Sequence, residues 1–370
     1  MNKQPSSRIR EIMPSGIRRI FDIACANPDG IDLSIGTPDF AVPEAIQEAA
    51  KEAIANGHNA YISTRGLPAL RSGLTERLKA KNLKFDDLLI TSGATGGYYL
   101  AILATIAPGD EVLIFDPYFV AYANVVIMCG GIPKFVNTYP DFKLSADAIL
   151  PHITKKTRAI LINNPGNPTG VVYSADELGV VADIAEKYAL HVISDEIYDE
   201  FVSGDSPFVS MGNLIGDAIV ISGFSKTFGI TGWRLGHVTG SQKMIDAMAT
   251  FQQYSYVCAN SVAQHAAVAA LDVDMSGIVR QYESRRDRVY NALKENFKMR
   301  KPGGAFYLFP EAPGGSANDF VNAAIERKVF VIPGAVFSNR DSHFRISIAS
   351  SENKLDKAAI VLNELATQFS

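Results

Sequence analysis

Short apolar runs alternate with helical patterns through the middle of the chain. Four of these runs contain β-branched residues and end at Asp, Asn, Gly or Ser, which is typical of strands buried on both faces of a sheet. They span residues 111–115, 158–162, 191–194 and 218–222. Between the second and third runs, Ser174 and Glu177 have the spacing of a helix N-cap and its first turn, which predicts a helix to about Tyr188. The alternation predicts an α/β fold with a mainly parallel sheet and helices on both faces.

The C-terminal part has a different pattern. A polar and amphipathic segment over about residues 275–298 precedes short β-like runs at 305–309, 329–332 and 344–348, and a final helix follows from about residue 353. Mixed short strands and helices predict a smaller α+β domain. We therefore expect a large domain over residues 45–280 and a small domain formed by both ends of the chain, 1–44 and 281–370.

The composition narrows the functions that such a fold can serve. In 370 residues, 35 basic side chains oppose 39 acidic ones, and the formal net charge of −4 argues against a nucleic-acid binder. Cys25, Cys129 and Cys258 are too far apart for a disulfide framework or a paired-cysteine zinc site. The six histidines lack metal-binding spacing, and no apolar run approaches the roughly 20 residues that span a bilayer. We expect a cytoplasmic enzyme or binding protein without a metal or membrane segment.

Candidate chemistry lies directly after the predicted strands, where ligands bind in open α/β sheets. The run NNPGNPTG, which contains Asn167, follows one strand, and Asp195 with Tyr198 follows the next. Ser225 and Lys226 follow a third strand. These side chains are predicted to meet in one crevice. A lysine in such a crevice can be a Schiff-base nucleophile, an anion anchor or a solvated surface charge.

Three motifs together resemble a known family. Residues 225–236, SKTFGITGWRLG, match the signature SKxxxxxGxRxG of the class I/II aminotransferases, and residues 164–170 and 195–198 match two further signatures at the expected spacing. The resemblance runs from about residue 32 to residue 349 and is to the aspartate and aromatic aminotransferase-like enzymes, which use pyridoxal phosphate (PLP) on fold type I. It implies a three-layer fold, a homodimer with shared active sites, and transfer of an amino group from an L-amino acid to a 2-oxo acid by a ping-pong mechanism.

The resemblance implies a role for each matching residue around the cofactor. Lys226 would hold PLP as an internal aldimine and then move the proton at the substrate's Cα. Asp195 would pair with the pyridine nitrogen and strengthen the electron sink, and Asn167 and Tyr198 would hydrogen-bond the 3′ oxygen. Tyr118 would stack on the cofactor ring.

The same resemblance implies two anion sites. The phosphate would be held at the start of a helix and by cations or hydroxyl groups, a combination suited to phosphate because a helix N-terminus attracts anions and arginine offers forked donors. The implied phosphate ligands are Gly93, Ala94, Thr95, Ser225, Arg234 and Tyr61, the last reaching the neighbouring subunit. The implied ligands of the substrate carboxylate are Gly36, Asn167 and Arg345.

Two positions depart from the family pattern. Gly223 stands where many relatives carry Ser or Thr, so the sequence does not show whether one phosphate contact is kept. Ser338 stands where a Gly is usual, so the sequence does not show the geometry of that loop.

The reaction type has alternatives. A PLP-dependent lyase of the β-elimination type would share the same signatures. A regulator that uses the fold as a sensor is disfavoured because no helix-turn-helix pattern precedes the matched region. No second arginine can be assigned to a side-chain carboxylate, so an aspartate-type and an aromatic-type substrate both fit.

Overall fold

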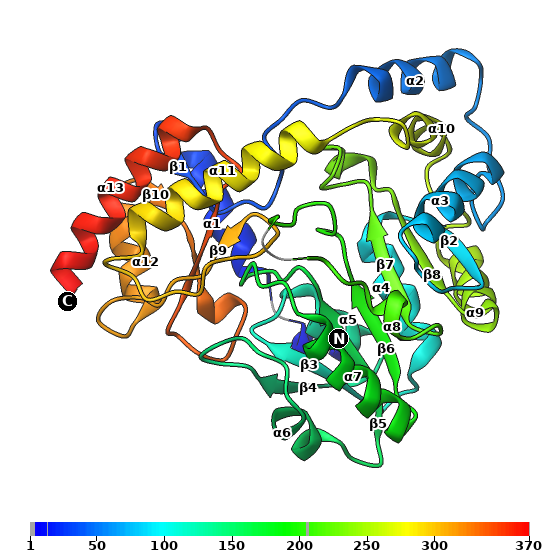
Figure 1. The fold of residues 1–370 in the computed structure, drawn as a ribbon, viewed down its shortest axis with the longest axis horizontal. Coiled ribbons are helices and arrows are strands. Elements are labelled where there is room, and N and C mark those ends of the chain that lie inside the picture. The colour runs from blue at the N-terminus through cyan, green and yellow to red at the C-terminus, as the bar shows by residue number, and fades with distance from the viewer. Residues whose placement is uncertain (1–3, 13, 205–206, 370) are drawn as a thin grey trace.

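A seven-stranded sheet forms the centre of the computed structural model, which describes residues 4–12, 14–204 and 207–369 (Figure 1). The strand order is β2-β8-β7-β6-β5-β3-β4, in which β8 runs antiparallel to both neighbours and the other pairs are parallel. The strands are β2 Asp87–Thr91, β3 Glu111–Asp116, β4 Ile132–Asn137, β5 Thr157–Asn163, β6 His191–Asp195, β7 Ile219–Gly223 and β8 Gly236–Gly240. The predicted α/β class and mainly parallel sheet are confirmed, and the four predicted strands are β3, β5, β6 and β7.

Helices cover both faces of this sheet. The helices of the described chain are η1 Ser7–Glu11, α1 Gly16–Ala26, α2 Glu44–Ala55, α3 Pro68–Ala80, α4 Gly93–Thr105, α5 Ala121–Met128, α6 Ala146–Ile149, η2 Leu150–His152, α7 Ala175–Tyr188, α8 Met211–Leu214, η3 Thr231–Trp233, α9 Gln242–Ser255, α10 Ser261–Ala270, α11 Ser276–Leu293, α12 Ala317–Glu326, η4 Gly334–Val336 and α13 Glu352–Phe369. The predicted capping box of α7 is present, because Ser174 and Glu177 each accept the other's backbone N–H.

Alternate residues of each central strand point to opposite faces, as the two-residue period of a strand requires. Along β3, Val112 and Ile114 pack into one core cluster with residues of α4, α5 and α9, whereas Leu113 and Phe115 pack into another with residues of α7 and α1. Both faces are therefore apolar, which is why the strand sequences show a continuous apolar run. Helix α4 lies close against the sheet, and its N-terminus thereby reaches the carboxyl edge of the strands.

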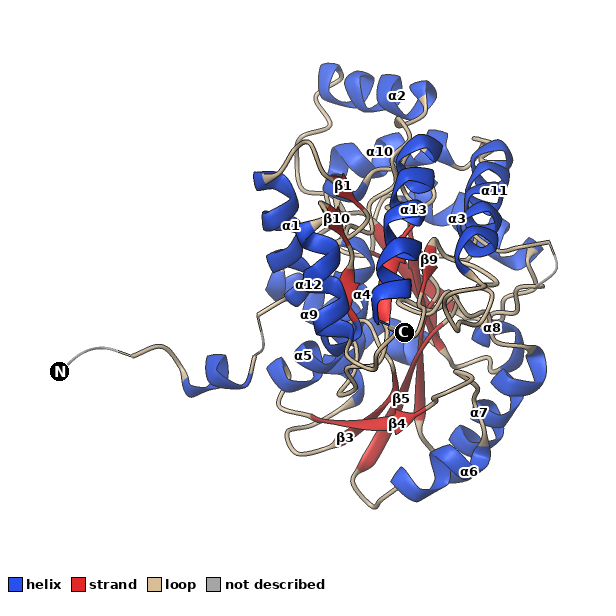
Figure 2. Cartoon of the chain, turned by 90° about the vertical axis from the view of Figure 1, so that its left-hand side faces the viewer, coloured by secondary structure: helices blue, strands red, loops and turns tan. Residues whose placement is uncertain are grey.

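A second, smaller group of strands lies beside the main sheet (Figure 2). Strands β1 Ile31–Asp32 and β10 Val329–Phe330 form a parallel pair, and β11 Ile332–Pro333, β12 Phe344–Ser347 and β9 Tyr307–Leu308 form an antiparallel sheet. Residues of α11, α12 and α13 form one core cluster with β9 and β12. The predicted domain limit at residue 280 lies inside α11, and the proposed division at residues 45 and 280 stays a prediction. No helix in the described ranges is long and apolar enough to cross a membrane.

Candidate active site

A cavity of about 970 Å³ lies at the carboxyl ends of the parallel strands β5, β6 and β7. This is the edge at which open α/β sheets bind their ligands. The predicted site residues that line the cavity are Gly36, Ala94, Thr95, Asn167, Asp195, Tyr198, Ser225, Lys226, Arg234 and Arg345. The structure thus brings together residues from positions 36 to 345 of the chain, and it leaves three predicted residues outside the cavity lining: Gly93, Tyr118 and Tyr61.

Lys226 lies in the loop after β7 and reaches into the cavity. Its ammonium group donates a hydrogen bond of 2.7 Å to the carbonyl of Gly36. Burial lowers the pKa of this lysine to about 8, and the positive charges of Arg345 and Arg234 act in the same direction. A neutral amine is therefore accessible near physiological pH, as a Schiff-base nucleophile requires.

Asp195 ends β6 and is buried. Its carboxylate accepts hydrogen bonds from the hydroxyl of Tyr122 at 2.7 Å and from the backbone N–H of Ile197 at 3.1 Å. Burial raises the pKa of this carboxyl to about 6, and the two hydrogen bonds and the charge of Lys226 oppose that shift. A cationic group that entered the cavity beside Asp195 would stabilise its charged form. No sequence motif indicated Tyr122, although it follows the same strand as Tyr118.

Arg345 is a buried cation on β12, with 1% of its surface exposed. Its guanidinium donates to the side-chain oxygen of Asn167 at 2.9 Å and to the carbonyl of Ser34 at 2.5 Å, and it lies over the rings of Tyr307 and Phe337. Its Nε has no partner, and no carboxylate of the described residues forms an ion pair with it. A buried guanidinium with a free donor is suited to an incoming carboxylate.

A second candidate anion site lies where α4 begins. Gly93 has a φ of +69°, and a Cβ at this position would lie 2.5 Å from the guanidinium of Arg234. Only glycine combines this left-handed backbone with such a close approach. Ser92 precedes the helix without capping it through its side chain, so the first backbone N–H groups of α4 stay available. The helix N-terminus, Arg234 and the hydroxyl of Ser225 together form a cradle for a phosphate-like group.

The aromatic ring that faces the cavity after β3 is that of Phe119. Tyr118, which we predicted to stack on the cofactor ring, does not line this cavity: its ring stacks on Phe135 with centroids 4.7 Å apart and lines a smaller adjoining cavity. Phe119 packs edge to face against Tyr122. Adjacent residues after a strand point in different directions, and the sequence pattern of two consecutive aromatic residues could not show which one turns inward.

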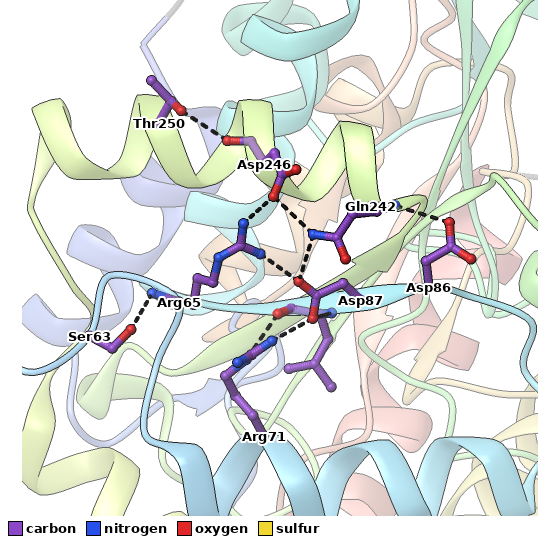
Figure 3. A network of polar contacts seen from close by, with 9 residues as sticks. Ser63, Arg65, Arg71, Asp86, Asp87, Gln242, Asp246 and Thr250 are labelled. Atoms are coloured by element: carbon purple, nitrogen blue, oxygen red, sulfur yellow. Dashed lines mark hydrogen bonds and ion pairs between the residues drawn. The ribbon is translucent and has the colours of Figure 1, made fainter.

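Tyr61 is 82% exposed and lies in the loop between α2 and α3. A polar network fixes the following residues of this loop (Figure 3). Arg65 forms ion pairs with Asp87 and with Asp246 of α9, and Arg71 of α3 also pairs with Asp87. The loop is therefore anchored to β2 and α9, and Tyr61 is exposed and does not line this chain's own cavity.

Gly223 ends β7 directly opposite Gly236 of β8. A Cβ at Gly223 would lie 2.9 Å from the Cα of Gly236 and 3.0 Å from the carbonyl of Leu235, so the close pairing of the two strands leaves no room for a side chain. Ser338 is buried, and its hydroxyl accepts the backbone N–H of Arg340. Its backbone is outside the left-handed region, so serine fits there without strain.

We expect Gly223→Ser to lower the free energy of unfolding by about 1–3 kcal/mol, because the added side chain forces β7 and β8 apart. Urea denaturation measures this change. Gly179→Ser on α7 is the matched control, since no heavy atom lies within 4 Å of a Cβ placed there. Equal stability of the two variants would contradict the close-packing explanation.

The cavity at the carboxyl edge of the sheet brings together a buried lysine amine, a buried carboxylate and two arginines. The family model for aminotransferase class I and II matches residues 28–362. The chain is a transaminase that belongs to the class I and II aminotransferase family, whose members typically use PLP.

Curated relatives and solved structures cover nearly the whole chain. The chain is 38% identical to a probable aspartate aminotransferase of Methanocaldococcus jannaschii, over 97% of this chain and 99% of the relative. It is also 38% identical to aromatic-amino-acid aminotransferase 2 of Thermococcus litoralis, over 95% and 96% of the two chains. The crystal structure of an aspartate aminotransferase from Thermotoga maritima has a TM-score of 0.92 and 34% identity, with 97% of this chain and 99% of that chain covered.

Proposed function

We propose that this transaminase binds PLP at the cavity and transfers the amino group of an L-amino acid to a 2-oxo acid by a ping-pong mechanism. The observation that carries the proposal is the position of Lys226, whose amine of lowered pKa shares one cavity with Asp195 and with the two anion sites. An amino acid offers an amine and a carboxylate, and PLP offers an aldehyde and a phosphate. The donors of the cavity match these groups.

The residues of the cavity fit PLP. The cradle of Gly93 and Arg234, with Ala94, Thr95 and Ser225 beside it, is suited to the phosphate, because a Cβ at position 93 would occupy the space next to the guanidinium. The buried carboxylate of Asp195 is suited to a protonated ring nitrogen. When bound, PLP supplies an electron sink that stabilises negative charge at the substrate's Cα.

We assign the remaining roles to side chains of the same cavity. Arg345, with its unpartnered Nε, holds the substrate's α-carboxylate together with Asn167 and the loop of Gly36. Lys226 would accept the proton at the substrate's Cα, for which its neutral form is required. Tyr198 would donate a hydrogen bond to the 3′ oxygen of the cofactor, and Phe119, which lines the cavity where Tyr118 does not, would support the ring.

We also propose a homodimer in the cytoplasm. Tyr61 is exposed and belongs to an anchored loop, which supports its reaching the phosphate of a neighbouring subunit. None of the described cysteines forms a disulfide, which supports a reducing compartment. A dimer mass from sedimentation and loss of PLP affinity in Tyr61→Phe would support the shared site, whereas an active monomer would contradict it.

The apolar part of the cavity lining favours an aromatic-type substrate over an aspartate-type one. Apolar side chains of α1, α5 and the loop before α5 form it: Ile17, Phe21, Phe119, Val125 and Met128. Among the described residues, the cations of the lining are Arg18, Lys226, Arg234 and Arg345. Arg18 is exposed and pairs with Asp22 at 3.3 Å, and Lys226, Arg234 and Arg345 have the roles assigned above.

A two-step spectroscopic assay tests the proposed function. The PLP-loaded protein is mixed with single L-amino acids, and we expect aromatic amino acids to convert its absorption to that of the pyridoxamine form. A 2-oxo acid then restores the original spectrum. An unchanged spectrum with every amino acid would contradict transamination, and release of ammonia without a 2-oxo acid would instead indicate a lyase.

We expect Gly93→Ala to weaken PLP binding at least about 10-fold, because the methyl group meets Arg234 and the left-handed backbone strains an L-residue by about 1–2 kcal/mol. Fluorescence titration of the apoprotein with PLP, repeated with inorganic phosphate as competitor, measures this affinity. Gly109→Ala is the control, since Gly109 also has a positive φ but no atom lies near its added Cβ. Equal losses of affinity in both variants would show that backbone strain alone is responsible.

A further inference from the structure

Tyr307 lies at the junction of the groups that bind substrate and cofactor. It begins β9, is buried, and lines the same cavity as Lys226. Its hydroxyl lies 2.9 Å from the hydroxyl of Tyr198, and its ring lies under the guanidinium of Arg345 at 4.5 Å. Resting on the proposed function, we propose that Tyr307 is a positioning residue that orients the phenol of Tyr198 as a donor toward the cofactor and holds Arg345 for the substrate carboxylate.

The role of Tyr307 toward Tyr198 follows from the direction of the hydrogen bond between the two phenols. A phenol has one hydrogen to donate and can also accept. If Tyr198 donates to the 3′ oxygen of the cofactor, its own oxygen is left to accept, and Tyr307 must be the donor of the 2.9 Å hydrogen bond. A phenol that accepts a hydrogen bond is a stronger donor, because neighbouring bonds in a chain polarise one another.

The role of Tyr307 toward Arg345 follows from the position of its ring. The guanidinium of Arg345 lies over the faces of Tyr307 and Phe337, with its carbon 4.5 and 4.8 Å from the ring centres. A desolvated cation gains from such ring faces, and two rings also restrict the plane in which the guanidinium fork lies. The ring and the hydroxyl of Tyr307 therefore act on two different partners, and substitutions can separate them.

Tyr307 also contacts the loop that faces Lys226. A Cβ at Gly36 would collide with the hydroxyl of Tyr307, so the two groups are in close contact, and the carbonyl of Gly36 accepts the ammonium of Lys226. The charges of Arg345 and Asp195 act on the phenol of Tyr198. The charge of Arg345 also acts on the phenol of Tyr307. Those around Lys226 are Arg345, Arg234 and Asp195.

The decisive variant is Tyr307→Phe, which keeps the ring and removes the hydroxyl. PLP-loaded wild type and variant are titrated with pH while the visible absorption of the lysine-bound cofactor is recorded. Donation to the 3′ oxygen lowers the pKa of this chromophore, so a weaker donor must raise it. We expect the midpoint to move up by about 0.2–0.6 pH unit, the size of a 10–30% change in a charge-assisted hydrogen bond. The KM for amino acids should change less than about threefold, since the ring stays under Arg345.

Two further variants test whether the hydroxyl of Tyr307 acts through Tyr198 and whether its ring positions Arg345. In a Tyr198→Phe background, Tyr307→Phe should add no shift, because its effect runs through Tyr198. Tyr307→Leu removes the ring and should raise KM by at least about tenfold, the loss expected for a buried cation–ring contact. Tyr282→Phe is the control, since Tyr282 loses a buried hydroxyl that donates to Asp39 outside the cavity.

The outcomes separate this inference from the proposed function. A midpoint that stays in place or moves down in Tyr307→Phe would overturn the donor direction, because removing an acceptor would free Tyr198 to donate. An unchanged KM in Tyr307→Leu would overturn the role toward Arg345. If the wild-type protein loaded with PLP shows no spectral change with amino acids, the proposed function itself fails, whatever the variants do.

Discussion

Lys226→Ala is expected to lower kcat for transamination by about 10⁴-fold or more, because one substitution removes both the covalent anchor of the cofactor and the group that moves the Cα proton. PLP should still bind through the phosphate cradle around Gly93 and Arg234, with a spectrum of the free aldehyde. Steady-state assays of 2-oxo acid formation measure kcat, and dialysis against PLP followed by absorption spectroscopy measures retention of the cofactor.

The pH dependence of cofactor capture gives an independent check on Lys226. Its pKa of about 8 means that the reactive neutral amine increases as the pH rises through this value. The rate at which the apoprotein forms the lysine-bound chromophore should therefore rise with pH and level off above about 8. A rate that keeps rising toward the pKa of an ordinary lysine, near 10.4, would contradict a lowered pKa.

A surface lysine provides the control for both measurements. Lys243 is exposed on α9, and Lys243→Ala should keep the turnover and the pH profile of the wild type. Substantial turnover in Lys226→Ala would show that another amine anchors the cofactor, and the assignment of Lys226 would then be wrong.

Arg345→Lys is expected to lower kcat/KM for amino acids by about 10²- to 10⁴-fold while cofactor affinity changes little. Lysine lacks the planar fork that can bind both oxygens of a carboxylate, and each lost hydrogen bond to a charged group is worth about 1.5–3 kcal/mol. Measuring kcat/KM for several donors and Kd for PLP separates the two effects. A uniform loss over all amino acids is expected, because the α-carboxylate is common to them.

Replacing either of two buried arginines should change the free energy of unfolding of the apoprotein by different amounts. Arg345 has no carboxylate partner among the described residues, so Arg345→Met removes the desolvation cost of a buried charge together with its hydrogen bonds and ring contacts, and the free energy of unfolding should stay within about 1 kcal/mol of the wild type. Arg285 pairs with Asp39 at 2.8 Å, and Arg285→Met should lower that free energy by about 1–3 kcal/mol. If Arg345→Met lowers the free energy of unfolding more than Arg285→Met does, Arg345 contributes to stability, and the explanation that it serves ligand binding and not stability is contradicted.

Local patterns in the sequence determined the elements and the chemistry at the strand ends. Strands β3, β5, β6 and β7 could be predicted because apolar runs buried on both faces carry their own signal, and α7 because its capping box is a local hydrogen-bond pattern. The order of the motifs around Asn167, Asp195 and Lys226 was sufficient to predict one crevice, since parallel strands end at the same edge of a sheet.

Only the tertiary structure decided which side chains meet there. The family resemblance already grouped Arg345 with Asn167, but the hydrogen bond between them spans 178 positions of the chain and is seen only in the folded protein. Tyr307 contacts Tyr198 from 109 positions away, and no sequence motif indicated that pair. The inward ring is Phe119 and not Tyr118, because the direction of a side chain after a strand depends on the backbone path. Gly223 is required by the strand opposite it. These features depend on packing between segments that are far apart in the sequence, whereas the strands and caps depend on neighbours along it.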